Sequence, residues 1–163
     1  MTDAHDLLLL LKEELELLEK AADILSYSFG KCKKIGIKEE YDYDELDRFE
    51  SLTSRFARLN DLLIQKIFRL IDQIDLEPGG TVRDRINRAE RKELINCADD
   101  FVKIRIIRND IAHEYLPEEI MELFKKVLKY TPDLLDSVKR VKEYCKNYQT
   151  EEPHTSSDGG APF

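Results

Sequence analysis

Apolar residues recur at helical spacing along most of the chain, and this period constrains the fold more than any other feature. Near the N-terminus, two leucine-rich series repeat every seven residues: Leu8, Leu15 and Ala22, and Leu11, Leu18 and Leu25. A seven-residue repeat places each series along one side of a helix. We therefore predict a helix from about residue 3 to residue 29. A second long helix is predicted from residue 44 to residue 75, where Phe, Leu and Ile repeat in the same way.

Turn and cap residues divide the rest of the chain. The polar segment 30–43 predicts a loop, and Pro78-Gly79-Gly80 ends the second helix. Thr81 and Asp84 have the spacing of an N-cap pair and begin a short helix. A further helix is predicted from 96–99 to about residue 113. A last helix runs from Pro117 to about residue 148, with a break or kink at Thr131-Pro132.

No segment shows a strand pattern or an internal repeat. The predicted fold class is therefore all-α: an up-and-down bundle of four long helices plus a short helix. Residues 1–149 form the predicted helical domain, and residues 150–163, which have no apolar period, a disordered tail. The length of 163 residues fits one domain.

Composition limits the possible functions. With 26 basic and 34 acidic residues, the formal net charge of −8 argues against non-specific coating of duplex DNA. The three widely spaced cysteines form no CxxC pair, which disfavours a disulfide framework or a zinc site and favours the reducing cytoplasm. Two of them, Cys97 and Cys145, are predicted as small core residues on apolar helix faces. The run Leu7–Leu11 is too short to span a membrane and lacks the basic start of a signal peptide.

Residues 105–115 contain the strongest candidates for catalytic side chains. Arg105, Asn109 and His113 are spaced by four and lie near one helix face, whereas Arg108 and Tyr115 lie near another. If the helix ends near His113, its imidazole can turn towards Arg108. A neutral imidazole can accept the proton of a ribose 2′-hydroxyl, and a guanidinium can hold the adjacent phosphate. From spacing alone, RNA cleavage without metal or cofactor and a purely structural helix cap are both open interpretations.

The string Arg108-Asn109-x-x-x-His113-x-Tyr115 resembles the R-x4-6-H motif of the HEPN superfamily, in the form seen in HepT-type toxins of HEPN/MNT toxin–antitoxin pairs. The resemblance extends to segments 81–85, 95–101 and 130–132 and is weaker before residue 42. It implies a HEPN-like domain over residues 1–149 that acts as a metal-independent endoribonuclease toxin of a type VII-like pair. Such an enzyme would cut tRNA or mRNA at a cleft shared by a homodimer.

The resemblance also implies residue roles. Arg108 and His113 would be the catalytic pair and Asn109 the polar residue between them. Tyr115 matches the tyrosine that a partner MNT nucleotidyltransferase adenylylates to silence the toxin. The alternatives are a non-catalytic HEPN subunit that presents substrates or nucleotides to a nucleotidyltransferase, and a helical interaction protein.

A net basic stretch leads into this motif. Residues 83–108 contain eight basic and five acidic side chains in an otherwise acidic protein. This stretch has two interpretations, a solvated face and an RNA-binding floor. The candidate RNA-binding residues are Arg83, Arg85 and Arg105. The acidic run 39–50 is predicted to be a solvated loop and helix cap, with a partner surface as the alternative. No membrane or DNA partner is predicted.

Overall fold

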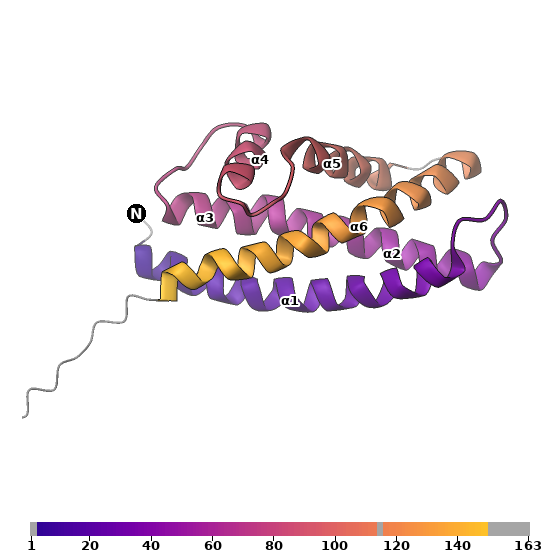
Figure 1. The fold of residues 1–163 in the computed structure, drawn as a ribbon, viewed down its shortest axis with the longest axis horizontal. Helices are drawn as coiled ribbons and strands as arrows, with labels where there is room; N and C mark the ends of the chain where they lie inside the picture. Colours follow the sequence, from indigo (N-terminus) through magenta and orange to yellow (C-terminus); the bar gives the residue numbers. More distant parts are fainter. Residues whose placement is uncertain (1–2, 114–115, 150–163) are drawn as a thin grey trace, which may run out of the picture.

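The computed structural model describes residues 3–113 and 116–149, and this part of the chain is an all-α bundle (Figure 1). Its helices are α1 (Ala4–Ile35), α2 (Tyr43–Asp61), η1 (Leu62–Ile67), α3 (Phe68–Ile74), α4 (Val82–Arg91), α5 (Ala98–Ala112), α6 (Pro117–Cys145) and η2 (Lys146–Gln149). Segments α2, η1 and α3 follow one another without interruption as one long rod. The rods α1, α2–α3, α5 and α6 alternate in direction, and the short α4 lies between α3 and α5 (Figure 1). The predicted fold class is confirmed. Tail residues 150–163 lie outside the described residues.

Helix α1 supplies the longest buried line of the core. Leu11, Leu18, Leu25 and Cys32 are at most 2% exposed, and α1 packs against α2, η1, α3 and α6. The prediction of a loop from Gly30 is wrong at its start, because Cys32 continues the buried line by one further repeat. The helix ends instead at Gly36, whose φ of 75° favours glycine.

The second rod is not a regular α-helix along its whole length. Residues Leu62–Ile67 are π-helical, and the N–H of Phe68 donates to the carbonyl of Leu63, five residues back. The carbonyl of Ile64 therefore lacks the donor that an α-helix would supply. Arg85 of α4 replaces it, since its Nη1 donates to this oxygen at 3.2 Å. The π-helical segment directly follows Asp61.

The caps of the later helices match the predicted caps only in part. Thr81 and Asp84 form the predicted capping box of α4. Helix α5 begins after Cys97, and its first N–H, that of Ala98, donates to the Glu90 carboxylate at 2.5 Å. Cys97 is therefore a half-buried N-cap residue with extended backbone, and its prediction as a core residue on a helix face is wrong. The same prediction for Cys145, which is 4% exposed, is confirmed.

Pro117 begins α6, as predicted, and the helix continues through Pro132 without a break. The Thr131 hydroxyl donates to the Val127 carbonyl at 2.6 Å, four residues back in the preceding turn. Thr131 and Leu134 are fully buried on either side of the proline, whereas Pro132 itself is exposed. The predicted break is therefore absent, and buried side chains on both sides of Pro132 hold the helix together.

A polar network ties α3, α4 and the end of α6 together. The buried Asp72 accepts hydrogen bonds from Arg88 Nε and Lys92 Nζ, both at 2.9 Å. Lys92 also contacts Asp75 at 3.0 Å, and Asp75 accepts from the hydroxyls of Tyr144 at 2.5 Å and Tyr148 at 2.6 Å. Burial opposes ionisation of Asp75, but these hydrogen bonds outweigh it and lower its pKa. Burial and the hydrogen bond to Asp75 raise the pKa of Tyr144 to about 12.

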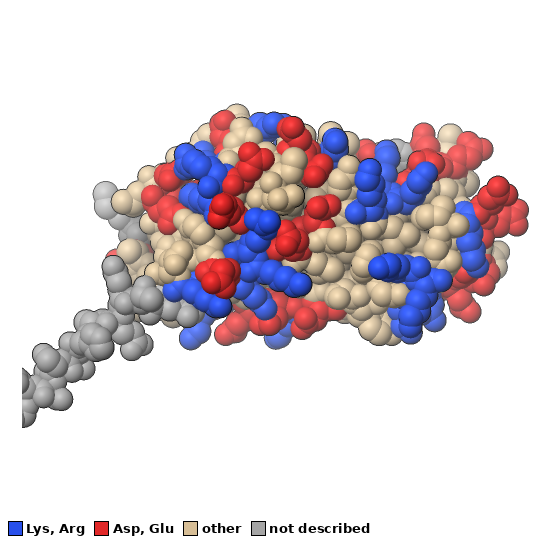
Figure 2. Space-filling view, viewed as in Figure 1, with Lys and Arg blue, Asp and Glu red and all other residues tan. Residues whose placement is uncertain are grey.

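Within residues 3–113 and 116–149, no helix combines the length and the apolar character needed to cross a membrane. On the face built by α1 and α6, basic and acidic side chains alternate and no broad basic surface forms (Figure 2).

Candidate functional site

The C-terminal end of α5 carries the predicted catalytic residues. Arg108 is half-buried and Asn109 is exposed, both within the last turn and a half of the helix. His113 is the C-cap residue: its backbone is extended (φ −102°, ψ 141°), its N–H donates to the Asp110 carbonyl at 3.2 Å, and its side chain is exposed. The predicted helix end near His113 is thus confirmed. Tyr115 lies outside the described residues.

Arg108 is held by a carboxylate from the second rod. Its Nε donates to Asp61 Oδ1 at 2.7 Å and its Nη2 donates to Asp61 Oδ2 at 2.9 Å. These hydrogen bonds raise the pKa of Arg108, so the guanidinium stays charged. A two-point contact of this kind fixes the plane of the guanidinium. A guanidinium has five N–H groups, and two are used here, so about three remain for another anion.

Asp61 was not found by sequence reasoning, although a signal exists. It is the single acidic residue between Glu50 and Asp72, in a segment that otherwise carries only basic and uncharged side chains. An isolated carboxylate in such a helix indicates a specific partner elsewhere in the fold. The partner itself, 47 residues away, is not visible in the sequence.

A cavity of about 330 Å³ opens beside the ion pair between α2–η1 and α5. It is lined by Asn60, Asp61, Ile64, Gln65, Arg105, Arg108 and Asn109. The structure therefore brings together three of the predicted residues: Arg105, Arg108 and Asn109. His113 is not among the lining residues. The lining carries two guanidinium groups and one carboxylate, which gives the cavity a net positive charge.

The other predicted RNA-binding arginines have different surroundings. Arg85 points its Nη1 at the Ile64 carbonyl of the π-helical segment. Burial lowers its pKa, and the neighbouring charges of Arg69 and Arg105 lower it further. Arg83 instead makes an exposed ion pair with Asp99 at 3.0 Å. Arg85 and Arg105 thus form a basic cluster with Arg69, a residue that was not predicted to bind RNA. Arg83 is not part of this cluster.

The opposite side of the α5 end is acidic. A groove of about 320 Å³ between α5 and α6 is lined by Asp110, Glu118, Glu119, Glu122, Leu123 and Lys126. Four carboxylates repel a phosphodiester backbone, while the arginine cluster attracts it. The charge distribution therefore favours approach of a polyanion from the α4 and second-rod side of Arg108.

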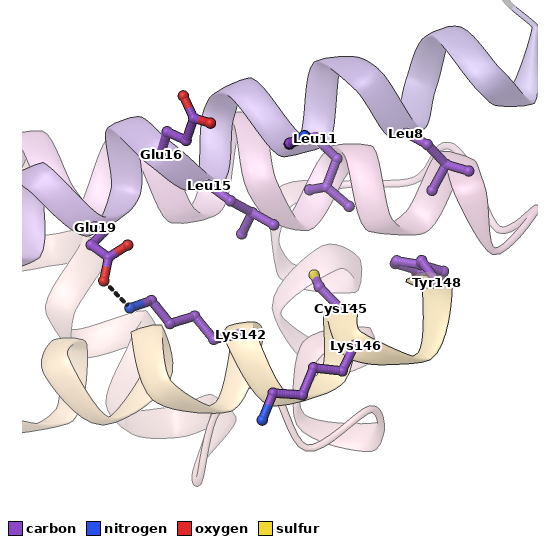
Figure 3. A pocket seen from close by; sticks show the side chains of 10 residues that line it. Leu8, Leu11, Leu15, Glu16, Glu19, Lys142, Cys145, Lys146 and Tyr148 are labelled. Atoms are coloured by element: carbon purple, nitrogen blue, oxygen red, sulfur yellow. Dashed lines mark hydrogen bonds and ion pairs between the residues drawn. The ribbon is translucent and has the colours of Figure 1, made fainter. Parts of the chain in front are cut away.

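Another groove, between α1 and the end of α6, has a different character (Figure 3). Its volume is about 440 Å³, and Leu8, Leu11, Leu15 and Tyr148 point into it. The Lys142–Glu19 ion pair of 2.6 Å crosses one end. The groove lining combines these apolar side chains with charged ones from both helices, and it brings together none of the predicted catalytic residues.

Residues 3–113 and 116–149 contain no group of three or more His, Cys, Asp or Glu side chains that could hold a metal ion. Comparison of the chain with protein-family models, with curated proteins and with solved structures found no match.

Proposed function

We propose that this protein is an endoribonuclease of the HepT type, in which Arg108 and His113 act on one phosphodiester of an RNA chain. The observation that carries the proposal is the Asp61–Arg108 ion pair. It orients a charged guanidinium at the mouth of a positively charged cavity, five residues before an exposed histidine at a helix end. tRNA and mRNA are the candidate substrates.

The chemistry needs only these side chains. The His113 imidazole accepts the proton of the ribose 2′-hydroxyl, and the 2′-oxygen forms a bond to the adjacent phosphorus. The bond from phosphorus to the 5′-oxygen breaks, and the proton is returned to that oxygen. The N–H groups of Arg108 that Asp61 leaves unused stabilise the charge that develops on the phosphate. The products end in a 2′,3′-cyclic phosphate and a 5′-hydroxyl.

RNA cleavage by the purified protein tests this function. With excess chelator present we expect cleavage to continue and to leave 5′-hydroxyl ends, because the mechanism uses no metal. Intact RNA after prolonged incubation would overturn the proposal and favour a non-catalytic subunit that binds nucleotides for a nucleotidyltransferase.

An exposed apolar line on α1 supports a homodimer. Leu10, Leu17 and Ile24 recur every seven residues and are 42%, 50% and 40% exposed. Leu17 and Ile24 also line a groove of about 520 Å³ that continues to Asp61 and Gln65, two of the residues that line the cavity beside Arg108. Exposed apolar surfaces of this kind mark protein contacts. A second copy bound here would lie next to Arg108 and bring two motifs towards a common cleft.

Replacing Leu17 with Glu should therefore convert a dimer into a monomer, because a buried carboxylate without a partner opposes association. Sedimentation velocity at micromolar concentration measures the change. Leu9→Glu is the matched control, since Leu9 is also 50% exposed but lies off the heptad line. Equal sedimentation of the wild-type and Leu17→Glu proteins would contradict this interface.

Regulation through Tyr115 is proposed from the sequence. Tyr115 follows His113 by two residues, so a group on its hydroxyl can reach the same end of α5. Adenylylation by a partner MNT nucleotidyltransferase would add a phosphate that pairs with Arg108 or Arg105 in place of the RNA phosphate.

Tyr115→Phe should therefore keep full RNase activity and escape silencing when it is co-expressed with the nucleotidyltransferase. Mass spectrometry of the silenced wild-type protein should find one added AMP on the peptide that contains Tyr115. A silenced protein with unmodified Tyr115 would contradict this mode of control and indicate occlusion by the partner.

A further inference from the structure

Three arginines from three different helices meet near the cavity at Arg108. Arg69 lies on α3, Arg85 on α4 and Arg105 on α5, and α4 packs against both α3 and α5 (Figure 1). Arg105 lines the cavity itself. Arg85 contacts another lining residue, because its Nη1 donates to the Ile64 carbonyl. Arg69, Arg85 and Arg105 together form the arginine cluster.

The positive charge of the arginine cluster is not neutralised within the described part of the bundle. Arg69 is exposed and Arg105 is half-buried. Neither makes an ion pair with a carboxylate of residues 3–113 or 116–149. Two neighbouring carboxylates, Asp61 and Asp72, already bind other cations. The cluster therefore keeps charge that an anion from outside can bind.

The members of the cluster repel one another. Burial lowers the pKa of Arg85, and the charges of Arg69 and Arg105 lower it further, although Asp72 opposes them. An anion that binds between the three guanidinium groups would relieve this repulsion. Phosphate is the anion that suits them best, because the N–H groups of a guanidinium form a fork that matches its oxygens.

The position of the cluster relative to Arg108 indicates which phosphate it would bind. Arg105 precedes Arg108 by about one helical turn, and both line the same cavity. On the other side of the α5 end lies the acidic groove that contains Asp110 and Glu118. A nucleic-acid strand with one phosphate at Arg108 is repelled by that groove and attracted towards the cluster.

We propose that the arginine cluster binds a backbone phosphate of an RNA strand, next to the phosphate held by Arg108. The assignment to RNA rests on the proposed function. Arg69 and Arg105 would contact the phosphate, and Arg85 would add its charge while it holds the Ile64 carbonyl. This binding is independent of base sequence, because contacts to phosphate do not read the bases.

Fluorescence anisotropy of the full-length protein with a short, labelled 2′-O-methyl RNA tests the site. The 2′-O-methyl group blocks cleavage and leaves every backbone phosphate in place. For a single strand, each phosphate contact adds about 0.7 to the slope with which log K falls as log salt rises. We expect Arg69→Gln and Arg105→Gln each to reduce this slope by about 0.7, equally for adenine and uracil oligomers.

Arg48→Gln is the matched control, because it removes the same charge from an exposed arginine of the same rod. Arg48 lies 21 residues before Arg69, which is about 30 Å along a helix. This distance exceeds the screening length of about 10 Å at 0.1 M salt. Arg48→Gln should therefore keep the wild-type slope. An equal reduction in Arg48→Gln would show an effect of net charge alone and would overturn the proposal.

A wild-type slope in either folded variant, Arg69→Gln or Arg105→Gln, would also overturn it. Thermal melting checks folding, and both variants should melt at or above the wild-type temperature because each removes a repelling charge. If the half-buried Arg105→Gln does not fold, the exposed Arg69→Gln decides alone. Slope changes as expected in a protein that leaves unmodified RNA intact would keep the phosphate site and reject the RNase function. Normal cleavage with wild-type slopes in both variants would do the reverse.

Discussion

His113→Ala should lower the rate of RNA cleavage by about 100- to 10,000-fold, the usual contribution of a positioned general base. His113 is exposed at the C-cap of α5, and residues 3–113 and 116–149 offer its side chain no hydrogen bond, so its removal should leave the fold unchanged. Arg108→Ala should lower the cleavage rate by a similar factor, because it removes the charge that stabilises the phosphate and leaves the Asp61 carboxylate beside the cavity without its cation.

Single-turnover cleavage of a labelled RNA, together with thermal melting, measures these effects. His5→Ala is the matched control, because His5 is also an exposed histidine and lies in the first turn of α1. That end of α1 and the C-terminal end of α5 lie at opposite ends of the bundle (Figure 1). The His5→Ala protein should cleave at the wild-type rate. A His113→Ala protein that melts as the wild type does and still cleaves normally would show that His113 has no catalytic role.

The largest expected effect on stability comes from Asp72→Ala. Asp72 is 3% exposed and accepts from both Arg88 and Lys92. Its removal leaves two cations without their main partner in a buried place. Removing one partner of a buried ion pair typically costs about 3–5 kcal/mol. We expect Asp72→Ala to lower the free energy of unfolding by about 3 kcal/mol, at the lower end of this range. Lys92 retains its ion pair with Asp75, and Arg88 retains its hydrogen bond to the Gly79 carbonyl. For a chain of this size, a loss of about 3 kcal/mol lowers the melting temperature by about 6–12 °C.

Calorimetry or thermal circular dichroism at neutral pH checks the value. Asp99→Ala is the matched control, because its ion pair with Arg83 is exposed on both sides, with side chains 77% and 52% accessible. An exposed pair contributes less than about 1 kcal/mol. If Asp72→Ala and Asp99→Ala shift the melting temperature equally, the network does not stabilise the bundle.

The sequence by itself determined the helices and their order. Heptad-spaced leucines, the Thr81–Asp84 cap pair and Pro117 at a helix start are local signals, and their effects depend on neighbours within a turn or two. Where longer-range packing intervenes, these signals fail. Gly30 lies inside α1 because Cys32 is buried, and Pro132 lies inside α6 because Thr131 and Leu134 are packed on both sides.

Only the tertiary structure decided the candidate site. The motif at Arg108, Asn109 and His113 is readable in one segment, but the carboxylate that orients Arg108 comes from Asp61, on a different helix. In the π-helical segment after Asp61, the Ile64 carbonyl accepts a hydrogen bond from Arg85 of a third helix. Asn60, Asp61 and Arg105 share a cavity only because α2 packs against α5. Sequence periodicity reports which side of a helix is apolar. It carries no information on which polar groups of separate helices meet, because that depends on how the helices are placed against one another.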